Sequence, residues 1–274
     1  MRTSTRMVVL GRFKGVLDLI LAIASVAYGL RRLYGSWTGA AIRVERSSDN
    51  AQLDIGFTAS GDLDIAALLA FVGSGSGFVT IWYDQSGNNR HATQTTAGSQ
   101  PRIVNNGVLQ TEGGKPAILL DGVDDSLASP AWGTIAQPFS RHYVGVRKSY
   151  AGISHWINSA DGIPNTAEYD DAATTHKMFA GIGTILVTLG NNERSVFSAA
   201  YNGASSLLSK NGVLTTGHPG DQGFNGIRIG GFTSNSAFSN ITMQELIVIT
   251  SAVSTTDRQT LERNQGKYYS ITVA

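Results

Sequence analysis

The arrangement of short β-type segments after residue 37 constrains the fold of this chain more than any other feature. In residues 40–49, apolar and charged residues alternate, which is the period of a half-buried strand. The Asn211-Gly212 dipeptide suits the positive φ angles of a two-residue hairpin. With 32 glycines and 15% charged residues in 274, the sequence predicts one large all-β domain. The other segments of this kind, bounded by turn residues, occupy 78–83, 115–127, 140–148, 183–190, 195–214, 224–232 and 242–250.

Three segments carry helix signals instead. Residues 62–73 begin with acidic residues, place apolar side chains at helical spacing and stop at Gly73. Residues 254–270 open with a Ser/Thr cap ahead of Asp257. Residues 16–34 have apolar residues at helical spacing and end in two arginines, which suit the C-terminal end of a helix. We therefore expect an N-terminal docking helix, one short inserted helix and a closing C-terminal helix.

The first 40 residues are basic, whereas the rest of the chain is mildly acidic. Six Lys and Arg against one Asp give +5 in this part, so the remaining residues sum to −4 within the net charge of +1. We expect the first dozen residues to form an arm that docks on a partner, and not on nucleic acid, because base-stacking aromatics are not interleaved. The apolar run that follows resembles a secretion signal, but Asp18 interrupts it and the chain begins at Met1. The run is also too short to span a bilayer, so no membrane partner is expected.

The residues that usually carry metal or cofactor chemistry are sparse. Cysteine is absent, which excludes disulfides and thiolate zinc sites in this sequence. The glycine run at 73–77 lacks the Lys-Ser/Thr of a phosphate loop and is interpreted as a flexible connection. We expect no cofactor and no metal. The five histidines show no ligand spacing and are expected at the surface or in hydrogen bonds: His91, His142, His155, His176 and His218.

Two polar turns leave alternatives open. In WYDQSGNNRHATQ (residues 82–94), turn formers follow an aromatic pair, which favours a structural corner. The functional alternative is a loop in which Tyr83, Arg90 and His91 hold a sugar. In DGVDD, the carboxyl groups could offer oxygen ligands to calcium, but a solvated turn in which Asp caps its own backbone is favoured. The carboxyl groups are those of Asp121, Asp124 and Asp125.

The second half of the chain contains the segments YNGASSLLSKNGVL, GIRIGG and MQELIVIT, followed by the predicted terminal helix. With these features it resembles a laminin-G-like, concanavalin A-like sandwich. Residues 37–125, with RSSD, DIGF and YDQSG, resemble the catalytic domain of family 54 α-L-arabinofuranosidases, and equally a set of laminin-G-like bacteriophage structural proteins. These resemblances imply a concanavalin A-like antiparallel β-sandwich over residues 37–274, preceded by an arm and docking helix over residues 1–36.

The arabinofuranosidase resemblance also implies a test of activity. Retaining glycosidases need two carboxyl groups about 5 Å apart. In those enzymes the acid/base Asp directly follows a Gly-Gly pair, where this chain has Gly230-Gly231-Phe232, and Phe cannot donate a proton. The vicinal cysteines that contact substrate there are missing, and Glu168 and Glu193 lie in the region of the nucleophile without matching neighbours. The sequence therefore predicts that the chain is not an enzyme.

These features together predict a ligand site and a function. A ligand site is expected on the concave face near Phe232 and Asn235, with Trp156 as a stacking ring. The chain is predicted to be a non-catalytic bacteriophage virion protein, a capsid decoration, tail or fibre component with a lectin-like domain. Its arm would dock on other virion proteins, the chain would form a homo-oligomer, and the sandwich would contact host surface glycans. The alternative is a secreted carbohydrate-binding module or an arabinofuranosidase-like glycoside hydrolase.

Overall fold

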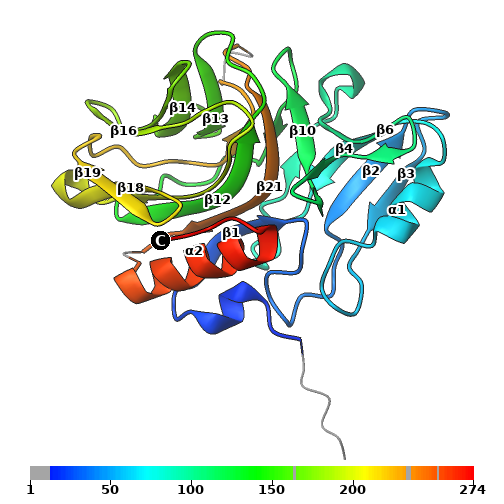
Figure 1. Cartoon of the computed structure of the whole chain (residues 1–274), viewed down its shortest axis with the longest axis horizontal. Coiled ribbons are helices and arrows are strands. Elements are labelled where there is room, and N and C mark those ends of the chain that lie inside the picture. The colour runs from blue at the N-terminus through cyan, green and yellow to red at the C-terminus, as the bar shows by residue number, and fades with distance from the viewer. Residues whose placement is uncertain (1–12, 163–164, 233–235, 252) are drawn as a thin grey trace, which may run out of the picture.

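The computed structural model describes residues 13–162, 165–232, 236–251 and 253–274. Within these ranges the chain forms antiparallel β-strands with two α-helices, which confirms the all-β prediction (Figure 1). No helix in the described ranges is long and apolar enough to cross a membrane. The strands curve around a common core, and the helix at the C-terminal end lies against the outside of the central strands (Figure 1).

The central layer is built on three long strands, β12 (Phe139–Arg147), β17 (Arg194–Tyr201) and β21 (Asn240–Ile249). Strand β12 lies between the other two and is antiparallel to both. The far edge of β21 pairs first with β10 (Ile118–Asp121) and then with β1 (Ala24–Gly29). Beyond β17 follow β18 (Ser206–Lys210) and β19 (Val213–Gly217), joined by the predicted hairpin with Asn211 and Gly212 at φ 52° and 85°.

A second group of strands covers the inner face of β12 and β17 (Figure 1). It runs from β16 (Thr184–Thr188) through β15 (Thr175–Phe179), β14 (Ala167–Ala172) and β13 (Ser154–Asn158) to β20 (Arg228–Ile229). Strand β20 continues into β11 (Leu127–Ala128) and β5 (Ala92–Thr93). Strand β5 also pairs with β4 (Gly77–Trp82). Strand β4 pairs in turn with β2 (Ile42–Arg46) and β6 (Arg102–Asn105), and β6 pairs with β10. The two layers are therefore linked at this side through hydrogen-bonded strands.

Short elements complete the fold around these layers. They are β3 (Gln52–Ile55), β7 (Val108–Leu109), β8 (Thr111–Glu112), β9 (Lys115–Pro116) and the 3-10 turns η1 (Val16–Leu19), η2 (Ala97–Ser99) and η3 (Gly203–Ser205). Two predicted helices are confirmed as α1 (Ile65–Val72) and α2 (Thr255–Tyr269). The side chains of Asp64 and Ser254 accept backbone N–H groups at their N-caps, as the sequence signals predict.

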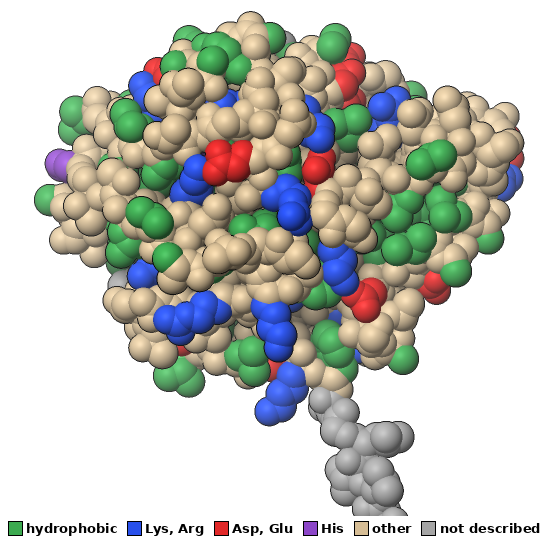
Figure 2. Space-filling view, viewed as in Figure 1, with side chains coloured by type: hydrophobic (Ala, Val, Ile, Leu, Met, Phe, Trp, Pro, Cys, Tyr) green, Lys and Arg blue, Asp and Glu red, His purple; other side chains and the backbone are tan. Residues whose placement is uncertain are grey.

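Both faces of the central strands are buried, because α2 covers the side opposite the main core. Leu246 and Val248 of β21 belong to the main core, whereas Ile247 and Ile249 pack with Leu261 of α2. All nine residues of β12 are buried for the same reason, including polar ones. The outer surface of α2 faces solvent, and Lys and Arg side chains lie along it (Figure 2).

The predicted N-terminal helix over residues 16–34 is wrong. Only the turn η1 is helical there, and β1 continues the sheet by pairing Tyr28 with Leu246. All six residues of β1 are buried, with Tyr28 in the main core and Ala27 under α2. A strand buried on both faces has no period-2 alternation, and its apolar run also fits helical spacing. The proposed arm over the first dozen residues lies outside the described ranges.

Candidate functional site

The side chains of the corner at residues 82–94 form hydrogen bonds to other parts of the protein. Trp82 is buried, and Asp84 accepts the N–H groups of Ala27 and Arg90 at 2.9 and 3.1 Å. The side-chain oxygen of Gln85 accepts the N–H of Leu33 at 2.8 Å. This segment therefore ties β1 to the strands that follow, as the structural interpretation predicts.

The three side chains of the sugar-binding alternative also have partners within the protein. The hydroxyl of Tyr83 donates to Asp54 at 2.8 Å, and Nδ1 of His91 accepts the N–H of Asp84 at 3.0 Å. The guanidinium of Arg90 lies 4.3 Å from the ring centre of Trp132. These contacts give the three side chains structural roles at the corner.

The predicted ligand residues lie in different environments. Trp156 is fully buried, and its indole N–H donates to Asp170 at 2.8 Å, so its ring is part of the core and cannot stack on a ligand at the surface. Phe232 is half-buried, and its ring centre lies 5.0 Å from that of His155, which in turn stacks on Tyr169 at 5.3 Å. Asn235 lies outside the described residues. A ligand role for Phe232 and Asn235 remains a prediction.

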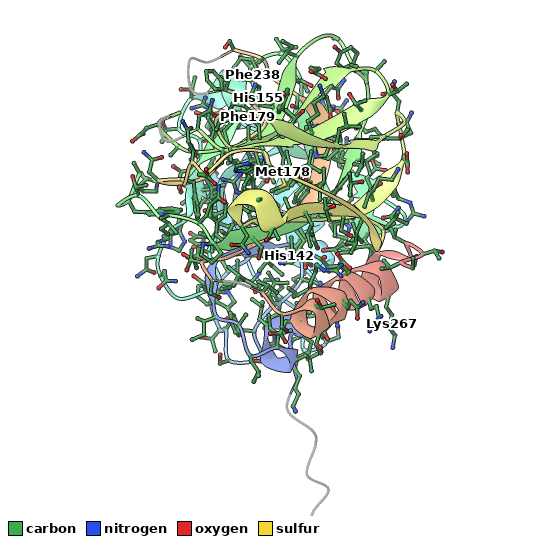
Figure 3. All side chains as sticks on the ribbon, turned by 90° about the vertical axis from the view of Figure 1, so that its left-hand side faces the viewer. His142, His155, Met178, Phe179, Phe238 and Lys267 are labelled. Carbon is green, nitrogen blue, oxygen red and sulfur yellow. The ribbon has the colours of Figure 1, made fainter. Side chains whose placement is uncertain are left out.

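Residues 230–232 and 236–239 hydrogen-bond to one another and to β13. The N–H of Gly230 donates to Trp156, the N–H of Ser239 to Gly230, and the N–H of His155 to Ala237, each at 2.9 Å. Figure 3 shows Phe238 and His155 near each other at one end of the molecule, away from His142 beside α2. A Cβ at position 231 would approach the Phe238 ring to 2.7 Å, so glycine is required for this packing.

The first hollow beside Phe238 is polar and has a volume of about 470 Å³. Its floor comes from three adjacent strands, since Ala128 of β11 is paired with Thr93 of β5 and with Arg228 of β20. Gln94 donates to Ser126 at 3.1 Å, and Arg228 donates to the Ser126 hydroxyl at 3.2 Å. The remaining lining residues are Thr96, Ser99, Val123, Asp124 and Phe238.

The second hollow lies on the other side of the same two apolar residues. It has a volume of about 480 Å³ and shares Val123 and Phe238 with the first. Asn240 in its wall donates to the Ser149 hydroxyl at 2.9 Å. The other lining residues include Asp121, Ser154 and the exposed Ile153. We call the two hollows together the Phe238 groove.

Three carboxyl groups meet where the two hollows join. One oxygen from each of Asp121, Asp124 and Asp125 lies within 4.8 Å of the others. Asp121 accepts the N–H of Val123 at 2.8 Å, and Asp125 accepts the N–H of Asp121 at 3.0 Å. These bonds are those of the predicted self-capped turn. Burial, and next the neighbouring charge of Asp121, raise the pKa of Asp125 to about 7.

This raised pKa predicts a specific pH dependence of stability. The folded state binds a proton at Asp125 up to about pH 7, whereas the unfolded carboxyl loses it near its ordinary value of 3.8. The stabilisation is therefore complete below about pH 4 and is lost as pH rises through 7. We expect Asp125→Asn to be more stable relative to the wild type at pH 8 than at pH 5, measured by urea unfolding. The exposed Asp221→Asn is the control, and equal differences at both pH values for Asp125→Asn would contradict the assignment.

The remaining histidines are hydrogen-bonded and do not form a shared site. His142 and His176 are fully buried, with partners Ser140 and Tyr143 at 3.0 and 2.7 Å. Burial lowers the pKa of His142 to about 3. His218 is exposed next to Asp221.

The two glutamates considered as nucleophiles from the sequence are held in ion pairs. Glu168 is fully buried and paired with Arg141, and Glu193 is paired with Lys210. None of these groups lines the Phe238 groove.

Comparison with known proteins gives a consistent relationship over part of the sequence. A family model described as alpha-L-arabinofuranosidase B, catalytic, matches residues 22–120. Alpha-L-arabinofuranosidase B of Aspergillus niger is 41% identical over 69 residues, which are 25% of this chain and 14% of that protein. The alpha-L-arabinofuranosidase of Hypocrea jecorina is 38% identical over 77 residues, 28% of this chain and 15% of that protein. The matches thus cover a small part of the length of these relatives.

Solved structures extend the similarity of fold to most of the chain. A mutant of a family 54 α-L-arabinofuranosidase soaked with 4-nitrophenyl α-L-arabinofuranoside has a TM-score of 0.65 at 18% identity, over 88% of this chain and 62% of that one. An arabinofuranosidase complexed with arabinofuranosyl-α-1,2-xylobiose has a TM-score of 0.63 at 17% identity, over 91% of this chain and 63% of that one. The relation to family 54 arabinofuranosidases expected from the sequence is supported.

These findings contradict the prediction of a non-catalytic bacteriophage virion protein. The family model, the relatives and the structures named above are those of glycosidases. The predicted virion location and the predicted partners, virion proteins docked through the arm, are wrong for the same reason. The prediction that the chain is not an enzyme is contradicted by the same findings. It rested on Phe232, on the missing cysteines and on the lack of matching neighbours at Glu168 and Glu193, and these say nothing about carboxyl groups supplied by other strands.

Proposed function

We propose that this chain is an extracellular glycoside hydrolase with a concanavalin A-like sandwich, and that it acts on glycans bearing arabinofuranosyl groups. The observation that carries the proposal is the pair of carboxyl groups at the middle of the Phe238 groove. Asp124 lines one hollow and Asp121 the other, and their oxygens lie within 4.8 Å. Retaining glycosidases hold their two carboxyl groups about 5–5.5 Å apart.

The ionisation of the cluster suits this chemistry. A retaining glycosidase needs one ionised carboxylate to attack the anomeric carbon and one protonated carboxyl group to protonate the leaving oxygen. Three neighbouring carboxyl groups cannot all be charged at low cost, and the raised pKa of Asp125 keeps one proton in the cluster near neutral pH. We assign Asp124 as the nucleophile that attacks the anomeric carbon, and Asp121 as the group that takes the proton held by Asp125 and passes it to the leaving oxygen as the glycosidic C–O bond breaks. Water then attacks the same carbon, gives its proton to Asp121 and releases Asp124 as a carboxylate, and the proton returns to Asp125.

The walls of the groove provide groups that bind sugar hydroxyls. Gln94, Ser99, Ser126 and Arg228 surround the first hollow, and Phe238 offers an apolar ring at its edge. Thr93, Gln94, Thr96 and Ser99 fall within the segment that matches the family model. The similarity to the arabinofuranosidases of Aspergillus niger and Hypocrea jecorina supports the substrate class. The carboxyl groups are assigned from the groove of this chain, because Phe232 stands where the resemblance implies the proton donor.

The test is release of arabinose by the purified full chain. Hydrolysis of arabinofuranosyl-α-1,2-xylobiose, followed by chromatography of the products with and without EDTA, is expected to give arabinose and xylobiose at the same rate in both. Activity that depends on an added divalent cation would overturn the carboxyl roles, because the cluster would then act as a metal site. Absence of arabinose under all conditions would overturn the proposal.

A second candidate, a carbohydrate-binding module, is favoured by Phe232. This half-buried ring, with His155 and Tyr169, gives an aromatic surface where the resemblance leads one to expect a proton donor. Calorimetric binding of the same trisaccharide without any product release would favour this candidate. Loss of that binding in Phe232→Ala, with the fold intact, would place the ligand at this surface and not in the Phe238 groove.

A further inference from the structure

We propose that the Phe238 groove binds at least two linked sugar units, one in each hollow, with the bond to be cleaved crossing between them over Phe238. This inference rests on the proposed function and specifies its substrate class: a glycan whose sugar units on both sides of the bond are recognised. A terminal sugar alone would fill only one side.

The shape of the groove is the first argument. The two hollows have similar volumes, about 470 and 480 Å³, and Val123 and Phe238 belong to both walls. Small-ligand clefts are roughly 300–1,000 Å³, so each hollow is large enough for a ligand group of its own. A site for one terminal sugar would be a single pocket that is closed on one side.

The position of the carboxyl groups is the second argument. Asp124 belongs to the first hollow and Asp121 to the second, although their oxygens lie within 4.8 Å. The carboxyl pair therefore flanks the boundary between the hollows. A glycosidic bond at this boundary has its two sugars on opposite sides.

The ring of Phe238 is the third argument. It is half-buried, and the glycine at position 231 lets the segment pack directly against it. The ring is thus fixed in place without being covered, and a fixed aromatic face can pack against the apolar face of a sugar ring at little entropic cost. The polar residues lie to each side, with Gln94 and Arg228 in one hollow and Ser149 and Asn240 in the other.

The experiment compares the affinities for a monosaccharide glycoside and a trisaccharide in a variant that binds substrate but does not cleave it. Calorimetry on full-length Asp124→Asn, with methyl α-L-arabinofuranoside and arabinofuranosyl-α-1,2-xylobiose, is expected to show at least about tenfold tighter binding of the trisaccharide. Phe238→Ala on this background is expected to weaken trisaccharide binding about tenfold and to change binding of the methyl glycoside much less. Phe238→Tyr, which keeps the aromatic ring, is expected to bind the trisaccharide as tightly as the variant with Phe238. Ile182→Ala, at an exposed residue outside both hollows, is the control.

The outcomes separate this inference from the proposed function. Equal affinities for the two sugars, unaffected by Phe238→Tyr or Phe238→Ala in a folded protein, would overturn the two-unit groove while leaving a glycan site in place. No binding of either sugar, with no hydrolysis by the wild type, would overturn the proposed function itself. Circular dichroism of each variant establishes that the fold is kept.

Discussion

Asp124→Asn is expected to reduce kcat/KM for arabinofuranosyl-α-1,2-xylobiose by at least about 10³-fold, because the amide cannot attack the anomeric carbon. Asp124 is at the surface of the groove, where its carboxylate accepts a hydrogen bond from the Ser99 hydroxyl at 3.3 Å. The substitution is isosteric and should leave the melting temperature nearly unchanged. Initial rates with the trisaccharide and with 4-nitrophenyl α-L-arabinofuranoside measure the effect.

The two substrates distinguish the roles of the two carboxyl groups. Nitrophenolate leaves without a proton, so Asp121→Asn should lose about 10²–10⁴-fold with the trisaccharide but far less with the nitrophenyl glycoside. Asp124→Asn should lose activity with both. If Asp121→Asn and Asp124→Asn behave alike on both substrates, the assignment of nucleophile and proton donor is wrong. Asp221→Asn, at an exposed site, is the matched control.

Arg141→Met is expected to lower the free energy of unfolding by about 3–5 kcal/mol. Arg141 is fully buried in β12 and donates to Glu168 at 2.8 Å and to Thr166 at 2.7 Å. Its guanidinium also lies 5.3 Å from the ring centre of Tyr201. Methionine fills much of the space but leaves the Glu168 carboxylate buried without its cation, and this is the main cost. Urea unfolding at pH 7 measures the change.

A double variant tests this explanation. In Arg141→Met/Glu168→Leu no charge is left unpaired, so most of the lost stability should return. The comparison pair is Arg43 and Asp54, whose side chains are 38% and 43% exposed, and Arg43→Met should cost less than about 1 kcal/mol. A double variant as unstable as Arg141→Met would show that packing around the guanidinium, and not the unpaired carboxylate, causes the loss.

Local sequence signals predict the local structure well. Asp64 and Gly73 lie at the two ends of α1, and Ser254 caps α2. The hairpin between β18 and β19 is predictable because its turn depends on two adjacent residues, Asn211 and Gly212. The error at residues 16–34 arises where the environment is non-local. Whether that apolar run becomes a helix or a strand depends on β21, more than two hundred positions later, and on α2, which covers it.

The candidate site could be predicted only in fragments. The turn with Asp121, Asp124 and Asp125, and the segment after Gly230-Gly231, are visible in the sequence as separate features. Their proximity is not, because it depends on the pairing of β11 with both β5 and β20. Phe238, Gln94 and Arg228 carry no sequence signal of their own; each becomes a groove residue through this cross-strand register. The inward orientation of Trp156 likewise depends on which face of β13 is covered.

The pairing of β1 with β21 has a consequence for how the protein folds during synthesis. Arg31, just after β1, forms its buried ion pair with Glu245 across 214 residues. The earliest strand of the described chain therefore has no strand to pair with until nearly all of the polypeptide has left the ribosome. Contacts of such long sequence separation make folding slow, since the loop must close before the contact stabilises anything. Nascent chains stalled before residue 240 should accordingly be digested readily by protease, and completed chains should acquire protection in one late step.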